Sequence, residues 1–413
     1  MSPAADATGG AAGALTPAGG PAAPTSSTPP ERALRSVLTS AAAALGVPGV
    51  EDVLGLGSTR RVLVVLVDGL GRSVLKRHVG HAPTLRAAMA DGGRVLVAAT
   101  PTTTAASLTS LGTGLDVGEH GVAGYDVLDP ERGVVVNMLG GWDEATDPVA
   151  WQPHATVFER AEAAGVDAVT VSLAEFEHSA LTRAGLRGGR FLSGRGLIAR
   201  TQHVARVLTE AREPTLVYFY ANELDKAGHR HGVGSDAWLH ALEEVDAAVR
   251  RLVARVPQGT LVLVTGDHGM VDVPVARRVD YAAVDEAGRL VDPALLEGVA
   301  HTAGEPRMVQ LHFTADAGDA LRARTRAAWQ ERFGAQAWVV TREEAVAAGW
   351  FGDRVTERVL PRIGELLVAC HGDLALYDGR RVSPRAFAMV GQHGSPTRAE
   401  REVPLLLLSL IHI

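Results

Sequence analysis

Three carboxylates and three imidazoles in this sequence are spaced so that they could form a metal centre. Asp267 and His268 are adjacent and flanked by glycines in GDHGM, which lets the backbone bend while both side chains converge. Asp225 and His229 in DKAGH are four residues apart and would share one face of a helix. The full set of candidate ligands is Asp68, Asp225, His229, Asp267, His268 and His393.

Each of these short patterns has an ordinary explanation when it is taken alone. The Asp68-Gly69 pair is a common turn signal, and Asp225 with His229 could be an ion pair on a helix surface. A single histidine such as His393 is usually structural. Taken together, the groups match the ligand chemistry of zinc or another borderline divalent cation, with enough donors for two ions.

The stretch ATPTTTAASLTSLGTG (99–114) adds a candidate nucleophile. Thr and Ser commonly cap helix N-termini, so capping is the ordinary explanation of the run of three threonines. Thr104 also opens a helix-like segment, whose N-terminus would attract a phosphate-like anion. A threonine hydroxyl is barely nucleophilic at neutral pH, and a neighbouring metal ion would lower its pKa. We therefore expect Thr104 to complete a nucleophile site beside the metal ligands.

The elements that must position these residues alternate between short apolar runs and longer helical patterns. This alternation is typical of a mainly parallel sheet covered by helices on both faces. Molecules and ions bind to such sheets outside the carboxyl ends of the strands. The candidate metal-binding side chains of this chain are found just after the strand-like runs. The clearest strand-like runs are 61–67, 166–173, 214–220 and 259–265. The clearest helix-like segments are 83–93, 155–165 and 235–256.

The domain organisation follows from changes in composition along the chain. One catalytic domain is predicted over residues 33–407, with a small inserted α+β subdomain or lid at about 281–350. Residues 1–32 are rich in Ala, Gly, Pro and Thr and predict a disordered tail. The last residues, LSLIHI (408–413), match one reading frame of a common sequencing adapter, so we expect them to be non-native.

The overall composition argues against several classes of function. The 413 residues carry 40 basic and 47 acidic side chains, a formal net charge of -7, without a polybasic block. Binding to nucleic acid or to anionic membranes is therefore poorly supported. No apolar run is long enough to span a membrane and no export signal is visible, so we expect a cytoplasmic location. The single cysteine, Cys370, excludes an intrachain disulfide.

In this order, the motifs resemble the nucleotide pyrophosphatase/phosphodiesterase branch of the alkaline phosphatase superfamily, over residues 60–395. The resemblance implies a three-layer alkaline-phosphatase-like α/β fold with a mostly parallel central sheet. It also implies hydrolysis of a small phosphate ester or nucleotide at two zinc ions. The matching elements are Asp68-Gly69, Pro101-Thr102-Thr103-Thr104, GLDVGEHG (114–121), Asp225 with Gly228-His229, Asp267-His268-Gly269-Met270 and Gln392-His393-Gly394.

The resemblance also implies roles for individual residues. Thr104 would attack phosphorus in line and form a phospho-threonine ester, which water then cleaves. Ser107, in place of an asparagine in other members, would donate to a non-bridging phosphate oxygen. Ala105 replaces an aromatic residue, which removes one candidate for stacking on a nucleobase. One zinc ion would be held by Asp225, His229 and His393, and the other by Asp68, Thr104, Asp267 and His268.

Several alternatives remain open on the sequence alone. A phosphomonoesterase or a phosphonate hydrolase of the same superfamily would differ only in small phosphate-pocket residues. A sulfatase is disfavoured because Cys370 lies in ACHGD and not in a Cys-x-Pro-x-Arg setting. A non-catalytic metal- or phosphate-binding protein would have no need of Thr104. Two further histidines are expected to be structural or at the surface, His120 and His231.

Overall fold

The computed structural model describes residues 22–24 and 28–408. Its larger sheet has seven strands in the order β2-β17-β8-β1-β7-β5-β6. Strand β1 pairs in parallel with β7 and β8, and β5 pairs in parallel with β6 and β7, whereas β17 is antiparallel to both of its neighbours. The bounds are β1 Arg61–Val67, β2 Arg94–Val97, β5 Asp167–Ser172, β6 Arg190–Ser193, β7 Thr215–Ala221, β8 Thr260–Thr265 and β17 Glu402–Leu408.

The apolar runs predicted as strands form the centre of this sheet. In β1, Val62 and Leu66 join the apolar cluster on one face, and Leu63 and Val65 join the cluster on the other. Side chains alternate between the two faces of a strand, so a strand covered on both sides needs a continuous apolar run. This explains why RVLVVLV contains no polar residue after Arg61.

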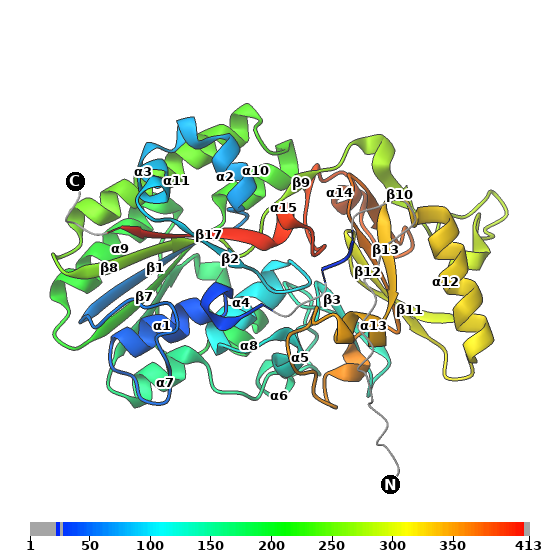
Figure 1. Ribbon diagram of the computed structural model, residues 1–413, viewed down its shortest axis with the longest axis horizontal. Coiled ribbons are helices and arrows are strands. Elements are labelled where there is room, and N and C mark those ends of the chain that lie inside the picture. Colours follow the sequence, from blue (N-terminus) through cyan, green and yellow to red (C-terminus); the bar gives the residue numbers. More distant parts are fainter. Residues whose placement is uncertain (1–21, 25–27, 409–413) are drawn as a thin grey trace, which may run out of the picture.

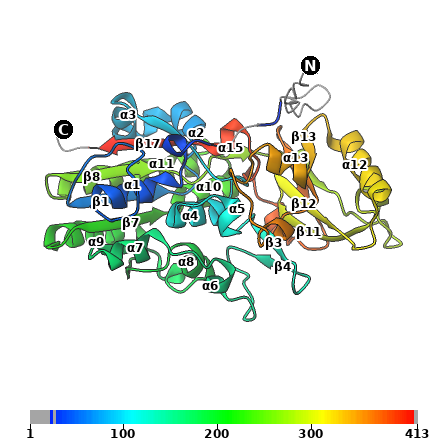
Figure 2. The same cartoon turned by 60° about the horizontal axis from the view of Figure 1, so that its bottom comes forward.

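Helices cover both faces of the central sheet (Figures 1 and 2). The segments predicted as helices at 83–93, 155–165 and 235–256 correspond to helices α3 (Pro83–Ala90), α7 (Val157–Ala163) and α11 (Asp236–Arg255). One face carries α1 Ser36–Ala44, α4 Thr104–Thr113, α5 Val117–His120, α7 Val157–Ala163 and α8 Ala180–Gly185. The other face carries α2 Arg72–Arg77, α3 Pro83–Ala90, α9 Gly196–Glu210, α10 Glu223–His231 and α11 Asp236–Arg255. None of the helices in the described part of the chain is long and apolar enough to cross a membrane.

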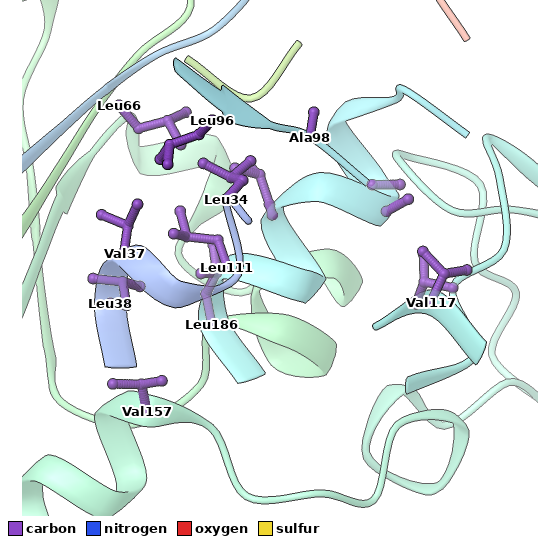
Figure 3. Packing of buried hydrophobic residues seen from close by; sticks show 14 of the residues in the cluster. Leu34, Val37, Leu38, Leu66, Leu96, Ala98, Leu111, Val117, Val157 and Leu186 are labelled. Carbon is purple, nitrogen blue, oxygen red and sulfur yellow. The ribbon is translucent and has the colours of Figure 1, made fainter. Parts of the chain in front are cut away.

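Helix α4 is buried along its whole length beneath the sheet. Figure 3 shows Leu111 of α4 among Val37 and Leu38 of α1 and Leu186, which follows α8. Burying a leucine side chain stabilises the fold by about 1.5–3 kcal/mol. These contacts fix the axis of α4, and with it the position of Thr104 at its first turn.

A second sheet of six strands lies beside the central one, at the other end of the molecule (Figure 1). Within about 281–350, strand β12 is followed by helix α12 (Asp319–Phe333) and strand β13, and β14 pairs between the two strands. The sheet is not confined to residues 281–350, because antiparallel pairing recruits strands from both sides of that range. In spatial order its strands are β13 Ala337–Thr341, β14 Leu366–Cys370, β12 Met308–Phe313, β11 Val299–Glu305, β3 Asp126–Asp129 and β4 Val134–Asn137.

Short elements complete the connections between the two sheets. Two pairs of short strands are β9 with β16 and β10 with β15. Their bounds are β9 Val271–Asp272, β10 Arg278–Asp280, β15 Ala375–Tyr377 and β16 Gly391–Gln392. The short helices are α6 Pro148–Trp151, α13 Arg342–Ala347, α14 Pro384–Phe387 and α15 Arg398–Arg401, and the 3-10 turns include η1 Pro30–Arg32 and η3 Ala174–Phe176.

Both predicted chain ends fall partly outside the described residues. Within 1–32, Ala23 is buried and the carbonyl oxygen of Pro24 accepts a hydrogen bond from Trp350 Nε1 at 2.8 Å. Ala23 and Pro24 therefore pack against the rest of the protein, although the segment around them is rich in Ala, Gly, Pro and Thr. One buried side chain and one hydrogen bond to the backbone hold them there. At the other end, Leu408 is the last residue of β17 and pairs with Val262, and 409–413 lie outside the described part.

Candidate active site

Five of the six candidate ligands lie in the segments that follow three neighbouring parallel strands, β8, β1 and β7. Asp68 directly follows β1, and Asp267 with His268 follows β8. Helix α10 begins after β7 and carries Asp225 and His229 on one face. The carboxyl ends of parallel strands meet at the same edge of a sheet, so these five side chains converge there.

Two glycines allow the loops to approach one another. Gly69 has φ +74°, and a Cβ at this position would lie 3.2 Å from the Cα of Asp225. A Cβ on Gly269 would lie 2.0 Å from the carbonyl oxygen of Ala399, closer than any real contact. The glycines beside the candidate ligands are therefore needed for close packing of the backbone.

The first group of ligand atoms comes from Asp225, His229 and His393. The Nε2 atom of His229 lies 3.3 Å from both Asp225 Oδ1 and His393 Nε2. The two Nδ1 atoms face backbone carbonyl oxygens, of Gly391 at 2.7 Å for His229 and of Thr102 at 2.8 Å for His393. These contacts fix the orientation of each ring and leave both Nε2 atoms facing one point, as metal-ligating histidines require.

The second group comes from Asp68, Asp267 and His268, all of them buried. His268 Nε2 lies 3.3 Å from Asp68 Oδ1 and 3.5 Å from Asp267 Oδ2. The same atom lies 3.2 Å from the hydroxyl of Thr104. The His268 ring stacks on that of His393 with centroids 3.6 Å apart, so the two groups are immediate neighbours.

The donor set fits two divalent cations. One carboxylate oxygen of each aspartate is buried without a hydrogen-bond partner in the described structure, namely Asp68 Oδ1, Asp225 Oδ1 and Asp267 Oδ2. Buried carboxylate oxygens are expensive to leave unpaired, and coordination of a cation satisfies them. Each group supplies three O or N donors within 4.8 Å of one another, which is the ligand chemistry of zinc with positions left for other ligands.

The pKa shifts of the two groups also favour binding of a cation. Burial and the neighbouring Asp68 raise the pKa of Asp225 to about 6 and that of Asp267 well above its usual range. Burial acts to lower the pKa of His268, but Asp267 and Asp68 raise it to about 10. Burial and the charge on His268 hold the pKa of His393 well below its usual value. The aspartates are thus close enough to repel one another, and a bound cation would relieve that repulsion.

The threonine run does not cap α4, contrary to its ordinary explanation. The N-cap residue, Thr103, makes no side-chain capping bond, and its buried hydroxyl has no partner among the described residues. The hydroxyl of Thr102 donates to the carbonyl oxygen of Ser395 and accepts from the backbone N-H of Gly394, both at 3.0 Å. Thr102 therefore fastens the loop that carries the third histidine, and Thr104 is left facing the ligands.

The structure does not bring Ser107 to the site. Its hydroxyl is fully buried, lacks a hydrogen-bond partner in the described chain, and does not line the cavity beside Thr104. Leu108 lines that cavity instead, because residues four apart share one face of a helix. Ala105 is also fully buried. The phosphate contact from Ser107 stays a prediction.

Sequence reasoning missed Tyr220, which acts directly on one candidate ligand. Its hydroxyl donates a hydrogen bond to Asp68 Oδ2, and the opposite oxygen of Asp68 faces His268. Burial acts to raise the pKa of Asp68, but the ion pair with His268 and the hydrogen bond from Tyr220 hold it below its usual value. The sequence did contain a signal for this contact. Tyr220 lies near the end of β7, and Tyr218, two residues earlier, lies on the same face of the strand.

A buried ion pair behind the site had no sequence signal. Both Glu400 oxygens accept from Arg307, at 3.0 and 2.7 Å, and Arg307 comes from the turn between β11 and β12. Glu400 Oε1 also accepts a hydrogen bond from the backbone N-H of Ser395 at 3.1 Å. The backbone carbonyl oxygen of Glu400 accepts a hydrogen bond from the backbone N-H of Gly269 at 2.6 Å. Glu400 thus holds the loops that carry His268 and the third histidine.

The two further histidines considered in the sequence analysis, His120 and His231, lie outside the site. His120 is fully buried, with Nε2 2.9 Å from the Ser110 hydroxyl and Nδ1 accepting the Val122 N-H. Burial lowers its pKa to about 3, so it is neutral. His231 is exposed at the end of α10. Both placements match a structural or surface role.

A cavity of about 720 Å³ opens beside the two groups of ligands. Thr103, Thr104 and the candidate ligands Asp68, Asp225, His229 and His393 line one end of it. Residues of α8, β6 and the second sheet line the rest. The volume is that of a small-molecule site and exceeds the space that a bare phosphate group needs.

The fold matches solved structures of ectonucleotide pyrophosphatase / phosphodiesterase 5. The murine protein gives a TM-score of 0.64 at 17% identity, covering 84% of this chain and 87% of that one. An inactive form of the murine protein in complex with AMP gives 0.63 at 16%, covering 84% and 87%. The human protein gives 0.63 at 15%, covering 85% and 88%. These matches confirm the predicted alkaline-phosphatase-like fold.

The family model for type I phosphodiesterase / nucleotide pyrophosphatase matches residues 62–396. That range is most of the chain and contains Thr104 and every candidate ligand. The family is metal-dependent and acts on small phosphodiester or nucleotide substrates. The chain therefore belongs to the type I phosphodiesterase / nucleotide pyrophosphatase family and is a phosphoric ester hydrolase.

Proposed function

We propose that this chain hydrolyses phosphodiesters through a covalent phospho-threonine formed on Thr104. The observation that carries the proposal is the position of Thr104, whose hydroxyl lies 3.2 Å from His268 Nε2 at the first turn of the buried helix α4. The hydroxyl is therefore within reach of a cation held by His268, which would lower the pKa of the hydroxyl and so activate it as a nucleophile. A protein that only bound metal or phosphate would have no use for this arrangement.

The chain offers two ligand groups for the cations that the family requires. Two bound zinc ions would supply Lewis acidity, which lowers the pKa of a hydroxyl and stabilises negative charge on a phosphoryl group. The first would be held by Asp225, His229 and His393, and the second by Asp68, Thr104, Asp267 and His268.

The chain's own residues then bind and orient the phosphate. Free backbone N-H groups at the N-terminus of α4 attract the anionic phosphoryl group toward Thr104. Thr104 Oγ1 gives up its proton and attacks phosphorus, the new Oγ1-P bond forms, and the bond from phosphorus to one ester oxygen breaks, so that this oxygen leaves and takes up a proton as an alcohol. Water then attacks the phospho-threonine, the Oγ1-P bond breaks, Thr104 regains its hydroxyl proton, and a phosphomonoester is released. The size of the cavity favours a diester over a phosphomonoester, because space remains on the far side of the phosphate.

The test compares Thr104→Ala with Thr104→Ser in zinc-loaded protein. Hydrolysis of bis-p-nitrophenyl phosphate, p-nitrophenyl phosphate and the p-nitrophenyl ester of thymidine 5′-phosphate is measured for each variant. We expect diesters to be preferred, Thr104→Ala to lose at least about 10³-fold in kcat/KM, and Thr104→Ser to retain part of the activity. Zinc content should be unchanged in both. A preference for the monoester, or full activity of Thr104→Ala, would contradict the proposal.

A further inference from the structure

One side of the cavity is formed by an apolar wall of five side chains. They come from four different elements, α4, η3, α8 with the residue that follows it, and β6, so the sequence gathers apolar groups there from distant positions. In β6, Phe191 lines the cavity while Leu192 packs on the opposite core, as strand alternation requires. The apolar wall consists of Leu108, Phe176, Leu181, Leu186 and Phe191.

The apolar wall begins directly at the reacting centre. The Tyr220 hydroxyl is bonded to the ligand Asp68, and the ring of Phe176 meets the Tyr220 ring edge-on, with centroids 5.8 Å apart. Leu186 packs against α4, the helix that begins with Thr104. A group attached to a phosphate at Thr104 would therefore lie next to this wall.

Four polar residues near the apolar wall, Ser179, Thr182, Thr170 and Tyr218, have hydroxyls that are already hydrogen-bonded to one another or lie beneath the cavity surface. The Ser179 hydroxyl accepts the Thr182 N-H at 3.2 Å and donates to the Thr182 hydroxyl at 3.0 Å, capping α8. The hydroxyl oxygens of Thr170 and Tyr218 are buried beneath the cavity surface. A nucleobase has several donors and acceptors that must be paired when they leave water, and this wall offers few partners for them.

The rest of the lining contains charged groups, and several of them are paired; the others include Glu305, and Lys226 lies 3.8 Å from Glu175. Arg381 and Asp126 pair at 2.9 Å, and Asp126 also accepts from the Asn137 amide at 2.9 Å. At the mouth, Tyr125 and Leu139 on either side of the β3-β4 hairpin are 38% and 37% exposed and line the same cavity. The apolar lining thus continues outward to solvent, which marks a route for an apolar ligand.

We infer that the cavity binds a hydrocarbon group of the substrate, so that the preferred substrate is a phosphodiester carrying an alkyl, acyl or aryl group in place of a nucleoside. This inference rests on the proposed phosphodiesterase function and names its substrate class. Transfer of each methylene from water to an apolar wall increases binding by up to about fourfold. Because the wall adjoins Thr104, the gain applies to the diester held in position for attack.

The first experiment measures kcat/KM of the zinc-loaded full chain on p-nitrophenyl methyl, butyl and octyl phosphate, below the concentrations at which these esters self-associate. The p-nitrophenyl ester of thymidine 5′-phosphate is measured beside them. We expect kcat/KM to rise by about two- to fourfold per methylene and the octyl ester to exceed the thymidine ester. A flat series, or a thymidine ester at least tenfold better than the octyl ester, overturns the inference while leaving the phosphodiesterase function intact.

Variants then locate the effect on the apolar wall. Phe191→Ser should reduce the ratio of octyl to methyl kcat/KM at least about tenfold, because one contact surface is lost. The matched control is Ile198→Ser on α9, whose side chain is 59% exposed and does not line the cavity. Ile198→Ser should leave the series unchanged. An equal loss in both variants, or none in Phe191→Ser, contradicts the assignment of the wall.

A binding measurement separates this inference from the proposed function. Calorimetric titration of zinc-loaded Thr104→Ala with methyl phosphate and with octyl phosphate requires no turnover. Octyl phosphate should bind at least about 30-fold more tightly. Equal affinities overturn the inference even if diesters are hydrolysed. Tighter binding of octyl phosphate without hydrolysis of any diester by the unmodified chain would support the apolar site and refute the proposed function.

Discussion

The two sheets of this molecule contribute to the site in different ways. The central parallel sheet brings Asp68, Asp267 and His268 to one edge, and α10 adds two more candidate ligands. The second, antiparallel sheet provides none of the candidate ligands, yet it lines the cavity and sends Arg307 behind the site. Reactive groups are therefore concentrated at strand ends of one sheet, whereas the other sheet supplies walls and support.

The largest effect is expected from a change at the central sheet. Asp225→Ala removes one carboxylate ligand, and the metal that it helps to hold contributes several kcal/mol to a phosphoryl transfer. We expect kcat/KM for bis-p-nitrophenyl phosphate to fall at least about 10³-fold, with zinc content reduced by about one ion per chain. Glu243→Gln, an exposed carboxylate on α11, is the control and should change neither. Full zinc content in Asp225→Ala would count against the ligand assignment.

At the second sheet, the expected effect is on stability. Arg307→Met leaves the Glu400 carboxylate buried without its partner, which costs about 3–5 kcal/mol of unfolding free energy in comparable cases. Urea unfolding monitored by circular dichroism measures the loss. Adding Glu400→Leu to Arg307→Met should recover part of it, because the unpaired charge is then removed.

The control for this ion pair is Arg326→Met. Arg326 pairs with Glu344 at 2.7 Å, but both side chains are about one third exposed. Exposed pairs contribute about 1 kcal/mol or less. If Arg307→Met and Arg326→Met destabilise the chain equally, the second sheet does not support the site in the way described.

A smaller effect is expected from the hydrogen bond between Tyr220 and Asp68. Tyr220→Phe removes the donor and leaves the ring in place, so Asp68 loses part of its fixed orientation. Removing a hydrogen bond that orients a metal ligand typically weakens metal binding about 10- to 100-fold. Competition with a chromogenic chelator measures the zinc affinity.

Tyr218→Phe is the matched control for Tyr220→Phe. Tyr218 lies two residues earlier on β7, and its buried hydroxyl has no hydrogen-bond partner in the described structure. Zinc affinity should therefore be unchanged. A similar loss in both variants would show that the Tyr220 effect is one of packing and not of hydrogen bonding.

The sequence was sufficient to predict those parts of the site in which a candidate residue directly follows, or lies on, an element with a clear local pattern. The run RVLVVLV predicts β1, and Asp68 at its end predicts where the site lies, because parallel strands place their carboxyl ends together. The four-residue spacing of Asp225 and His229 predicts their shared face on α10. The position of Thr104 at the start of a helix was likewise visible in the sequence.

Features that depend on distant contacts could not be predicted. That Leu108 lines the cavity and Ser107 is fully buried depends on tertiary packing, which the local sequence does not specify. Arg307 and Glu400 are 93 residues apart, and no local pattern pairs them. The second sheet assembles β3, β4 and β14 around residues 281–350, because antiparallel partners are chosen by packing and not by sequence order.

The Arg307-Glu400 pair also limits how the molecule can move. Arg307 donates to the carbonyl oxygens of Cys370 and Leu374 as well as to Glu400, whose backbone and side chain bind the loops of the metal ligands. Cys370 and Leu374 belong to the same side of the molecule as Arg307, so a rotation of one sheet against the other would break the buried contacts between Arg307 and Glu400. Rigid-body hinging between the sheets is therefore disfavoured.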